Sequence, residues 1–215
     1  MTQTPPSTRS EFRAAVDGFV ELVATVPSAR LDGPGLGEWS VRELIGHTAR
    51  ALVTVEDYYG REGPGDKLEG PVAYWLAGAN LAPSGSDARR RRDEGITDRA
   101  RKSAEALGED IAGAVSELAG RVLDLVDQSS DDMPMATSMG PMTLRGYLPT
   151  RTFELAVHTL DLAEAVGLPA PEVLKPAVSA SLVLAARLAA VGPGAGQVLL
   201  ALSGRRPLPP GFSVI

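Results

Sequence analysis

Cysteine is absent from the 215 residues of this sequence. The absence excludes disulfide bonds, thiolate metal ligands, iron–sulfur clusters and a cysteine nucleophile. Histidine is almost as scarce, because the chain has only two, His47 and His158. Any site that uses imidazole must therefore draw on one or both of these residues.

Positive charge is in deficit, with 21 Lys+Arg against 27 Asp+Glu and a net charge of −6. This balance gives no reason to expect a nucleic-acid partner. Long apolar runs are also lacking, since Arg187 and Gly192–Gly194 interrupt the least polar stretch, Pro176–Ser203, below the roughly 20 residues that a spanning helix needs. The segment Met1–Ser10 is polar and does not resemble a signal peptide. We expect a cytoplasmic protein without a membrane partner.

The apolar residues, 44% of the chain, recur mostly at three- and four-residue steps, which is typical of helices. We find no strong alternating pattern of strands; a weak strand alternative exists at Val198–Leu202, and residues 129–142 read as a methionine-rich connection. The fold class predicted is therefore all-α. The expected helices run from Thr8 to before Pro27, from Ser40 to about Tyr59, from Pro71 through Leu76, and over 97–128, 143–166, 172–191 and 197–202.

Two helix starts carry a capping-box pattern, in which a hydroxyl and a side chain three residues later cap each other's backbone amides. The clearer one is Ser40 with Glu43, where Trp39 can also pack onto Leu44. Thr8 with Glu11 fits the same pattern at the first helix. The Ser40 cap matters most because that helix carries His47 about two turns later.

Glycine and proline set the expected breaks in the helices. Gly167 is the predicted C-cap of the helix that carries His158. Pro149 should either kink that helix or mark its start. Gly108, Gly113 and Gly120 weaken the long helix over 97–128 locally and allow a bend there.

Three residues form the candidate metal site. Glu154 and His158 are four positions apart in a predicted helix, so they share one face and can share one ion. His47 lies on the inner side of the other well-capped helix. Two imidazoles and one carboxylate, with a position left for water or substrate, are typical of a catalytic zinc site and also suit other first-row metals.

Spacing alone leaves a second interpretation open. Glu-x-x-x-His is a common helical pair that contributes only a few tenths of a kcal/mol as a surface interaction. A lone inward histidine is also more often a hydrogen-bonded core residue than a ligand. A metal site and two structural histidines therefore remain alternatives at this point.

A resemblance adds to the first interpretation. Residues 38–47 (EWSVRELIGH) resemble the first metal-binding motif of the mycothiol-dependent maleylpyruvate isomerase family, which is part of the wider DinB-like group. Residues 151–162 (RTFELAVHTLDL) resemble the second motif, and Leu202–Pro209 resembles the close of many members. The likeness runs in order from about residue 10 to 205, and the two motifs are specific only as a pair.

The resemblance implies an up-down-down-up four-helix bundle over residues 8–167, followed by a short, mostly helical extension over 168–215 that packs on the bundle. It assigns the metal ligands to His47, Glu154 and His158. Since only 168–215 follow the second motif, the separate α/β C-terminal domain of the isomerase is expected to be reduced or missing.

The function implied is that of a divalent-metal enzyme, with zinc expected, that uses a low-molecular-weight thiol, mycothiol, in S-transfer or thiol-assisted isomerisation of a small electrophile. The alternative is a non-catalytic metal- or ligand-binding bundle that acts through a protein partner. A third outcome is a bundle that binds no metal and keeps the ligand residues as relics. The oligomeric state is left open between a monomer and a homodimer.

Other polar residues near the motifs have two interpretations each. Asp161 either accepts a hydrogen bond from a ligand histidine or is a solvated acid. Arg50 either meets an anionic substrate or forms a surface salt bridge, which we favour. Arg145 or Arg151 can hold a carboxylate. The run Arg89–Arg92, flanked by acids, is read as a solvated helix start.

Aromatic and methionine side chains complete the list. Trp39, Tyr74 and Trp75 are expected in the core or in a pocket wall. The methionines at 133, 135, 139 and 142 lie in a segment that either covers the pocket mouth or is a flexible connection.

Overall fold

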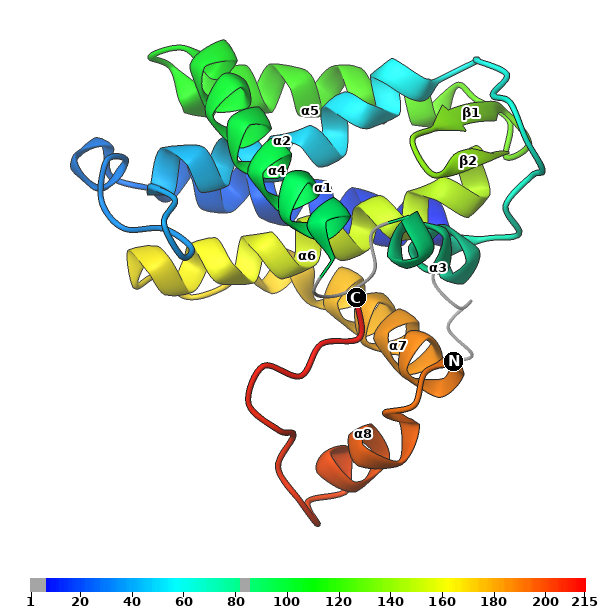
Figure 1. Ribbon diagram of the computed structural model, residues 1–215. Helices are drawn as coiled ribbons and strands as arrows, with labels where there is room; N and C mark the ends of the chain where they lie inside the picture. The colour runs from blue at the N-terminus through cyan, green and yellow to red at the C-terminus, as the bar shows by residue number, and fades with distance from the viewer. Residues whose placement is uncertain (1–6, 82–85) are drawn as a thin grey trace, which may run out of the picture.

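The structure is a computed structural model that describes residues 7–81 and 86–215 (Figure 1), with the side chains of Leu81, Arg89, Arg92 and Asp93 outside the description. It confirms the all-α fold class. The described helices are α1 (Thr8–Thr25), α2 (Val41–Tyr58), α3 (Pro71–Leu81), α4 (Asp87–Leu107), α5 (Ile111–Asp127), α6 (Leu144–Val166), α7 (Lys175–Val191) and α8 (Ala195–Leu202).

Helices α1, α2, α5 and α6 form the four-helix bundle, in which α1 and α2 each pack against both α5 and α6. The colours in Figure 1 show that α1 and α6 run one way along the bundle and that α2 and α5 run the other way, which is the expected up-down-down-up topology. The core between the helices is apolar and closed to solvent. Its largest fully buried side chains include Phe12, Phe19, Leu44, Leu52, Leu148 and Leu155.

The capping box that begins α2 is confirmed. The Ser40 amide donates to Glu43 Oε2 at 2.8 Å, and the Glu43 amide donates to Ser40 Oγ at 3.2 Å. The predicted C-cap of α6 is also confirmed, because Gly167 lies in the left-handed region with φ 67°. Pro149 lies inside α6, and the helix starts before it at Leu144.

The capping residues predicted for α1 were wrong by one position. Ser7, not Thr8, is the N-cap, and its partner is Ser10 rather than Glu11. Ser7 has the extended backbone of a cap, with φ −89° and ψ 158°, and its hydroxyl accepts from the Ser10 amide. The Ser10 hydroxyl substitutes for the longer carboxylate in the return hydrogen bond.

The single helix predicted over 97–128 was wrong, because the structure divides it into α4 and α5. Gly108 adopts φ +68°, a left-handed conformation that ends α4. Asp110 then caps α5 by accepting from the Gly113 amide at 3.0 Å. The break turns α4 out of the bundle, so that it crosses over α2 (Figure 1).

The methionine-rich connection is partly a β-hairpin, which the sequence interpretation did not predict. Strands β1 (Pro134–Thr137) and β2 (Gly140–Thr143) pair antiparallel, with Met135 opposite Met142. Both methionines are buried, and α6 begins directly after β2. The weak strand alternative at Val198–Leu202 was also wrong, because these residues belong to α8.

Helix α7 packs against α6 and α1, and α8 follows it away from the bundle (Figure 1). A small second cluster joins Phe153 of α6 to Leu184 and Leu188 of α7, and Val214 of the tail packs against it. Among the described residues, Glu172–Val191 is long and apolar enough to cross a membrane by length and composition alone, with mean hydropathy 1.5. That finding is weak evidence, since core helices pass the same test. The predicted domain boundary at 167/168 stays a prediction.

Gly46 allows α4 to lie unusually close to α2. A Cβ atom at this position would lie 2.5 Å from the backbone nitrogen of Ala104. Gly46 directly precedes His47, so the close contact fixes α4 over the part of α2 that carries the candidate ligand. Ala100 and Ala104 supply the small, buried face of α4 at this crossing.

We predict that Gly46→Ala lowers the free energy of unfolding by about 1–3 kcal/mol, because the added methyl group forces the two helices apart. Gly120→Ala is the matched control, since Gly120 is a helical glycine with nothing within 4 Å of the added Cβ. That control should raise stability by about 0.5–1 kcal/mol. Urea unfolding followed by circular dichroism measures both, and equal effects of the two substitutions would contradict the close packing described here.

Candidate metal centre

The three residues singled out in the sequence converge in the structure. His47 is on α2, whereas Glu154 and His158 are on α6, and these two helices pack against each other. One possible ligand atom from each of the three lies within 4.8 Å of the others. The two imidazole rings are 4.7 Å apart between centroids and nearly perpendicular, at 83°. Donor atoms from two segments far apart in the sequence thus surround one small volume.

Glu154 lies between a histidine and an arginine. Its Oε2 is 3.3 Å from Nε2 of His158, and its Oε1 is 3.9 Å from Nη2 of Arg151. The Glu154 and His158 side chains are 25% and 16% exposed, so both remain accessible from one side. A small ion could therefore reach the carboxylate without a change of fold.

Asp161 acts on His158 rather than on solvent alone, which decides between its two interpretations. The Nδ1–H of His158 donates to Asp161 Oδ2 at 3.0 Å. A carboxylate at this distance holds the hydrogen on Nδ1 and leaves Nε2 facing Glu154. Asp161 thus orients the ring in the way that metal-binding histidines usually require.

His47 has a buried nitrogen without a partner. Among the described residues no group forms a hydrogen bond with its Nδ1. The Trp39 ring lies beside the imidazole, at 4.6 Å between centroids. An unsatisfied buried polar atom costs about 1–3 kcal/mol, and a cation bound by the imidazole is one way to offset such a cost.

The pKa values of the trio diverge. Burial, together with the nearby His158, lowers the pKa of His47 to about 4. Burial alone would lower the pKa of His158, but its hydrogen bonds with Asp161 and Glu154 outweigh burial and raise it to about 9. Burial would likewise raise the pKa of Glu154, yet the His158 hydrogen bond and the Arg151 charge lower it to about 2. At neutral pH the trio therefore holds one neutral imidazole, one imidazolium and one carboxylate.

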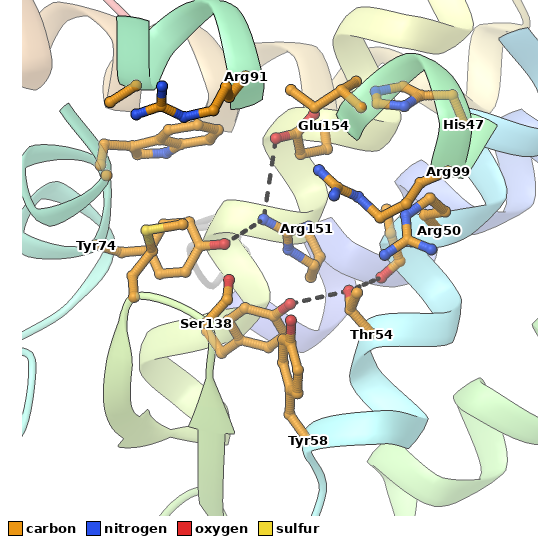
Figure 2. Close-up of a pocket in the computed structure, with 17 residues that line it drawn as sticks. His47, Arg50, Thr54, Tyr58, Tyr74, Arg91, Arg99, Ser138, Arg151 and Glu154 are labelled. Atoms are coloured by element: carbon orange, nitrogen blue, oxygen red, sulfur yellow. Dashed lines mark hydrogen bonds and ion pairs between the residues drawn. The ribbon is translucent and has the colours of Figure 1, made fainter. Parts of the chain in front are cut away.

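A cavity of about 630 Å³ lies beside the trio, and His47 and Glu154 form part of its wall. This volume is in the range of small-molecule sites. Helices α2, α3, α4 and α6 and the turn of the hairpin all contribute lining residues. Figure 2 shows the labelled side chains pointing into this space, with Arg151 at its centre.

The cavity wall is rich in arginine. Arg50, Arg91, Arg99 and Arg151 all line it, whereas Glu154 is the one carboxylate among the described lining residues. The interpretation of Arg91 as part of a solvated helix start was therefore incomplete, because α4 lies over the cavity and carries this side chain to its rim. Figure 2 shows Arg91 on the opposite side of the cavity from Arg50 and Arg99.

A set of tyrosines and a threonine forms the floor of the cavity. The Tyr147 hydroxyl donates to Thr54 Oγ1 at 2.9 Å, and Arg151 Nη2 donates to the Tyr74 hydroxyl at 3.3 Å. Burial raises the pKa of Tyr147 well above its usual range, so its hydroxyl stays neutral. Tyr147 and Thr54 were missed in the sequence, where their helical positions predict only core packing.

The remaining alternatives from the sequence are resolved as follows. Arg50 lines the cavity, which favours a role toward a ligand over the surface salt bridge. Arg145 is exposed, whereas Arg151 is buried in the cavity wall. Tyr74 and Trp75 line the cavity as expected, and Met139 lines it from the hairpin turn.

Comparison with known proteins gives one match. Residues 12–163 match the sequence model of a family described as mycothiol maleylpyruvate isomerase N-terminal domain. The match covers more than half of the chain and includes all three residues of the trio. No curated protein and no solved structure matches the chain.

The opposed pKa shifts predict a maximum in the stability of the protein when a chelator keeps it free of metal. The raised pKa of His158 contributes stability below about pH 6.5, the value for an unfolded histidine, and this is lost as the pH rises through about 9. The lowered pKa of His47 removes stability as the pH falls from about 6.5 through about 4. Each effect should be on the order of 2–3 kcal/mol.

Urea unfolding in EDTA at pH 5, 6.5 and 8.5 measures this dependence. The decline between pH 6.5 and 8.5 should disappear in His158→Gln, and the decline toward pH 5 should shrink in His47→Asn. A wild-type stability that is unchanged over this range, or variants that keep both slopes, would contradict the assigned charge states.

Proposed function

The chain belongs to the mycothiol maleylpyruvate isomerase N-terminal domain family, and on this premise we propose that it is a divalent-metal-dependent enzyme that uses a low-molecular-weight thiol. The thiol proposed is mycothiol, and the reaction is S-transfer to, or thiol-assisted isomerisation of, a small electrophile. The observation that carries the proposal is the convergence of His47, Glu154 and His158 within 4.8 Å at the wall of a cavity.

We assign the metal to this trio, with zinc as the expected ion. Two imidazoles and one carboxylate are a donor set found in catalytic zinc sites, where a fourth position stays open for water or substrate. The unpartnered, buried Nδ1 of His47 fits such a role, because it lacks any other hydrogen-bond partner among the described residues. Asp161 would keep the His158 ring oriented with Nε2 toward the ion, and the ion would displace the hydrogen from Nε2.

A bound divalent metal supplies the chemistry that the chain itself lacks, since it binds a thiol sulfur and lowers its pKa so that the thiolate forms near neutral pH. The chain has no cysteine, so the nucleophilic sulfur must come with the cosubstrate. His47 and Glu154 line the cavity, which supports binding of the cosubstrate on that side of the trio.

Two outcomes follow for an electrophile held in the cavity. In S-transfer, the thiol proton is released, a new S–C bond forms, and the leaving group departs with the electrons of the bond that breaks. In thiol-assisted isomerisation, the sulfur adds to a conjugated double bond, the electron pair moves to the adjacent carbonyl oxygen, and rotation about the resulting single bond is followed by loss of the same thiol. The second outcome regenerates the thiol, whereas the first consumes it.

The cellular setting of the proposal is the cytoplasm, where mycothiol would serve as a reduced thiol pool. The partners proposed are small molecules, namely the thiol and the electrophile. Neither requires a protein partner, and this separates the proposal from the alternative of a non-catalytic bundle that acts by interaction.

Cobalt substitution tests the proposal directly. The protein stripped with EDTA and loaded with one Co²⁺ per chain should bind mycothiol with a new thiolate-to-cobalt charge-transfer band in the near ultraviolet. The S-methyl derivative of mycothiol is the matched control, because it keeps the sugar portion but cannot form a thiolate. His158→Ala should lose most of its cobalt and, with it, the band.

Each failure has a distinct meaning. A wild-type protein that binds cobalt but gives no band with mycothiol would replace the enzyme proposal by the non-catalytic metal-binding alternative. A His158→Ala variant that binds as much cobalt as the wild type would remove the assignment of the site itself.

A further inference from the structure

The cavity carries a positive charge that the rest of the chain does not share. Among the described residues, four arginines and one carboxylate line it, although the whole chain has a net charge of −6. A divalent metal at the trio would make the cavity more positive still. Positive charge that is concentrated in a cleft attracts negatively charged ligands.

Arg151 is the most deeply placed of these cations. Its side chain is 9% exposed, and it lies against two aromatic rings, with the guanidinium carbon 4.9 Å from the Tyr147 ring centre and 5.6 Å from that of Tyr74. Nε donates to Thr150 Oγ1 at 3.1 Å, and Nη2 donates to the Tyr74 hydroxyl at 3.3 Å. Hydrogen bonds with described residues thus use two of the five N–H groups of a guanidinium.

The counter-charge of Arg151 is weak and shared. Glu154 Oε1 is 3.9 Å from Nη2 of Arg151, which is beyond hydrogen-bond distance, while its Oε2 is 3.3 Å from His158. If Glu154 binds a divalent ion, its charge is committed to that ion. Arg151 would then be a buried cation with aromatic faces and neutral hydroxyls around it, and a buried charge without a counter-charge is strongly unfavourable.

We propose that Arg151, positioned by Tyr74, binds a carboxylate of the electrophilic substrate and thereby selects carboxylate-bearing electrophiles over neutral ones. The inference rests on the proposed function and assigns a specificity residue to the same site. A guanidinium with free N–H groups matches the two oxygens of a carboxylate, and the contacts with the two tyrosine rings and the hydrogen bond to the Tyr74 hydroxyl hold its position. The buried Nε1–H of Trp75, another lining residue, also lacks an acceptor among the described residues.

The electrophile is the more suitable source of this carboxylate than the thiol. Mycothiol is an amide-linked sugar thiol that carries no carboxylate or phosphate, so an arginine-rich wall does nothing specific for it. The site instead has two parts. The metal trio on one side would bind the thiol sulfur, and Arg151 at the centre would bind the carboxylate of the electrophile. Figure 2 shows this division, with His47 and Glu154 above Arg151 and the hydroxyls of Tyr74, Thr54 and Tyr58 around it.

Binding of a simple dicarboxylate tests the inference without knowledge of the substrate. Succinate is titrated into the zinc-loaded protein and into the EDTA-treated protein by calorimetry, with succinamide as the uncharged probe of the same shape. The wild-type protein should bind succinate at least tenfold more tightly than succinamide. Arg151→Gln should reduce the succinate affinity by at least tenfold, and Arg151→Lys by about three- to tenfold, because lysine keeps the charge but not the fork.

Two further variants protect the test against misfolding. Tyr74→Phe removes only the hydroxyl that accepts from Arg151, and it should weaken succinate binding about three- to fivefold with an unchanged circular dichroism spectrum. Arg145→Gln is the matched control for net charge, since Arg145 is exposed on the same helix, and it should change the affinity less than twofold.

Equal affinity for succinate and succinamide, or wild-type affinity in both Arg151→Lys and Tyr74→Phe, would overturn the inference. So would succinate binding that falls equally in Arg145→Gln and Arg151→Gln. The proposed function fails separately, because zinc content and the cobalt band with mycothiol are recorded on the same preparations. Loss of those signals with selective succinate binding intact in EDTA would overturn the enzyme proposal and leave the anion site standing.

Discussion

The close packing of α2 against α6 is the constraint on which the rest of this structure depends. Only this packing brings His47 within 4.8 Å of Glu154 and His158, which are more than 100 positions away in the chain. The Ser40–Glu43 capping box fixes where α2 begins, and therefore which of its residues faces α6. Gly46 lets α4 lie tightly over the same turn, so the ligand-bearing part of α2 is held from two sides.

The same packing explains the electrostatics of the site. Two imidazoles, two carboxylates and an arginine share a partly buried space, in which each group alters the pKa of its neighbours. His158 lies between Glu154 and Asp161 and holds a proton, whereas His47 has no carboxylate in hydrogen-bond contact among the described residues and stays neutral. A divalent cation fits this arrangement, since it would replace a proton on His158 and bind the neutral imidazole of His47.

Much of this arrangement could be predicted from the sequence, because it depends on local signals. The Ser40 cap, the Gly167 terminator and the four-residue spacing of Glu154 and His158 are all properties of single helices. The predictions that were wrong concern positions where two local conformations have nearly equal free energy. Gly108 can bend or end a helix, and Ser7 and Thr8 are both good caps, so the spacing of apolar residues could not decide between these alternatives.

The hairpin was missed because its four-residue strands are too short to show an alternating pattern. The cavity was invisible for another reason: Arg91, Thr54 and Tyr147 come from three helices whose crossing angles no local pattern encodes.

The most direct test of the account is a crystal structure of the zinc-loaded protein with diffraction data on both sides of the zinc absorption edge. We predict one anomalous peak, about 2.0–2.2 Å from an imidazole nitrogen of His47, a carboxylate oxygen of Glu154 and Nε2 of His158, with the fourth position facing the cavity. A peak bound by Glu154 and His158 without His47, or zinc found only elsewhere on the protein, would contradict the central claim.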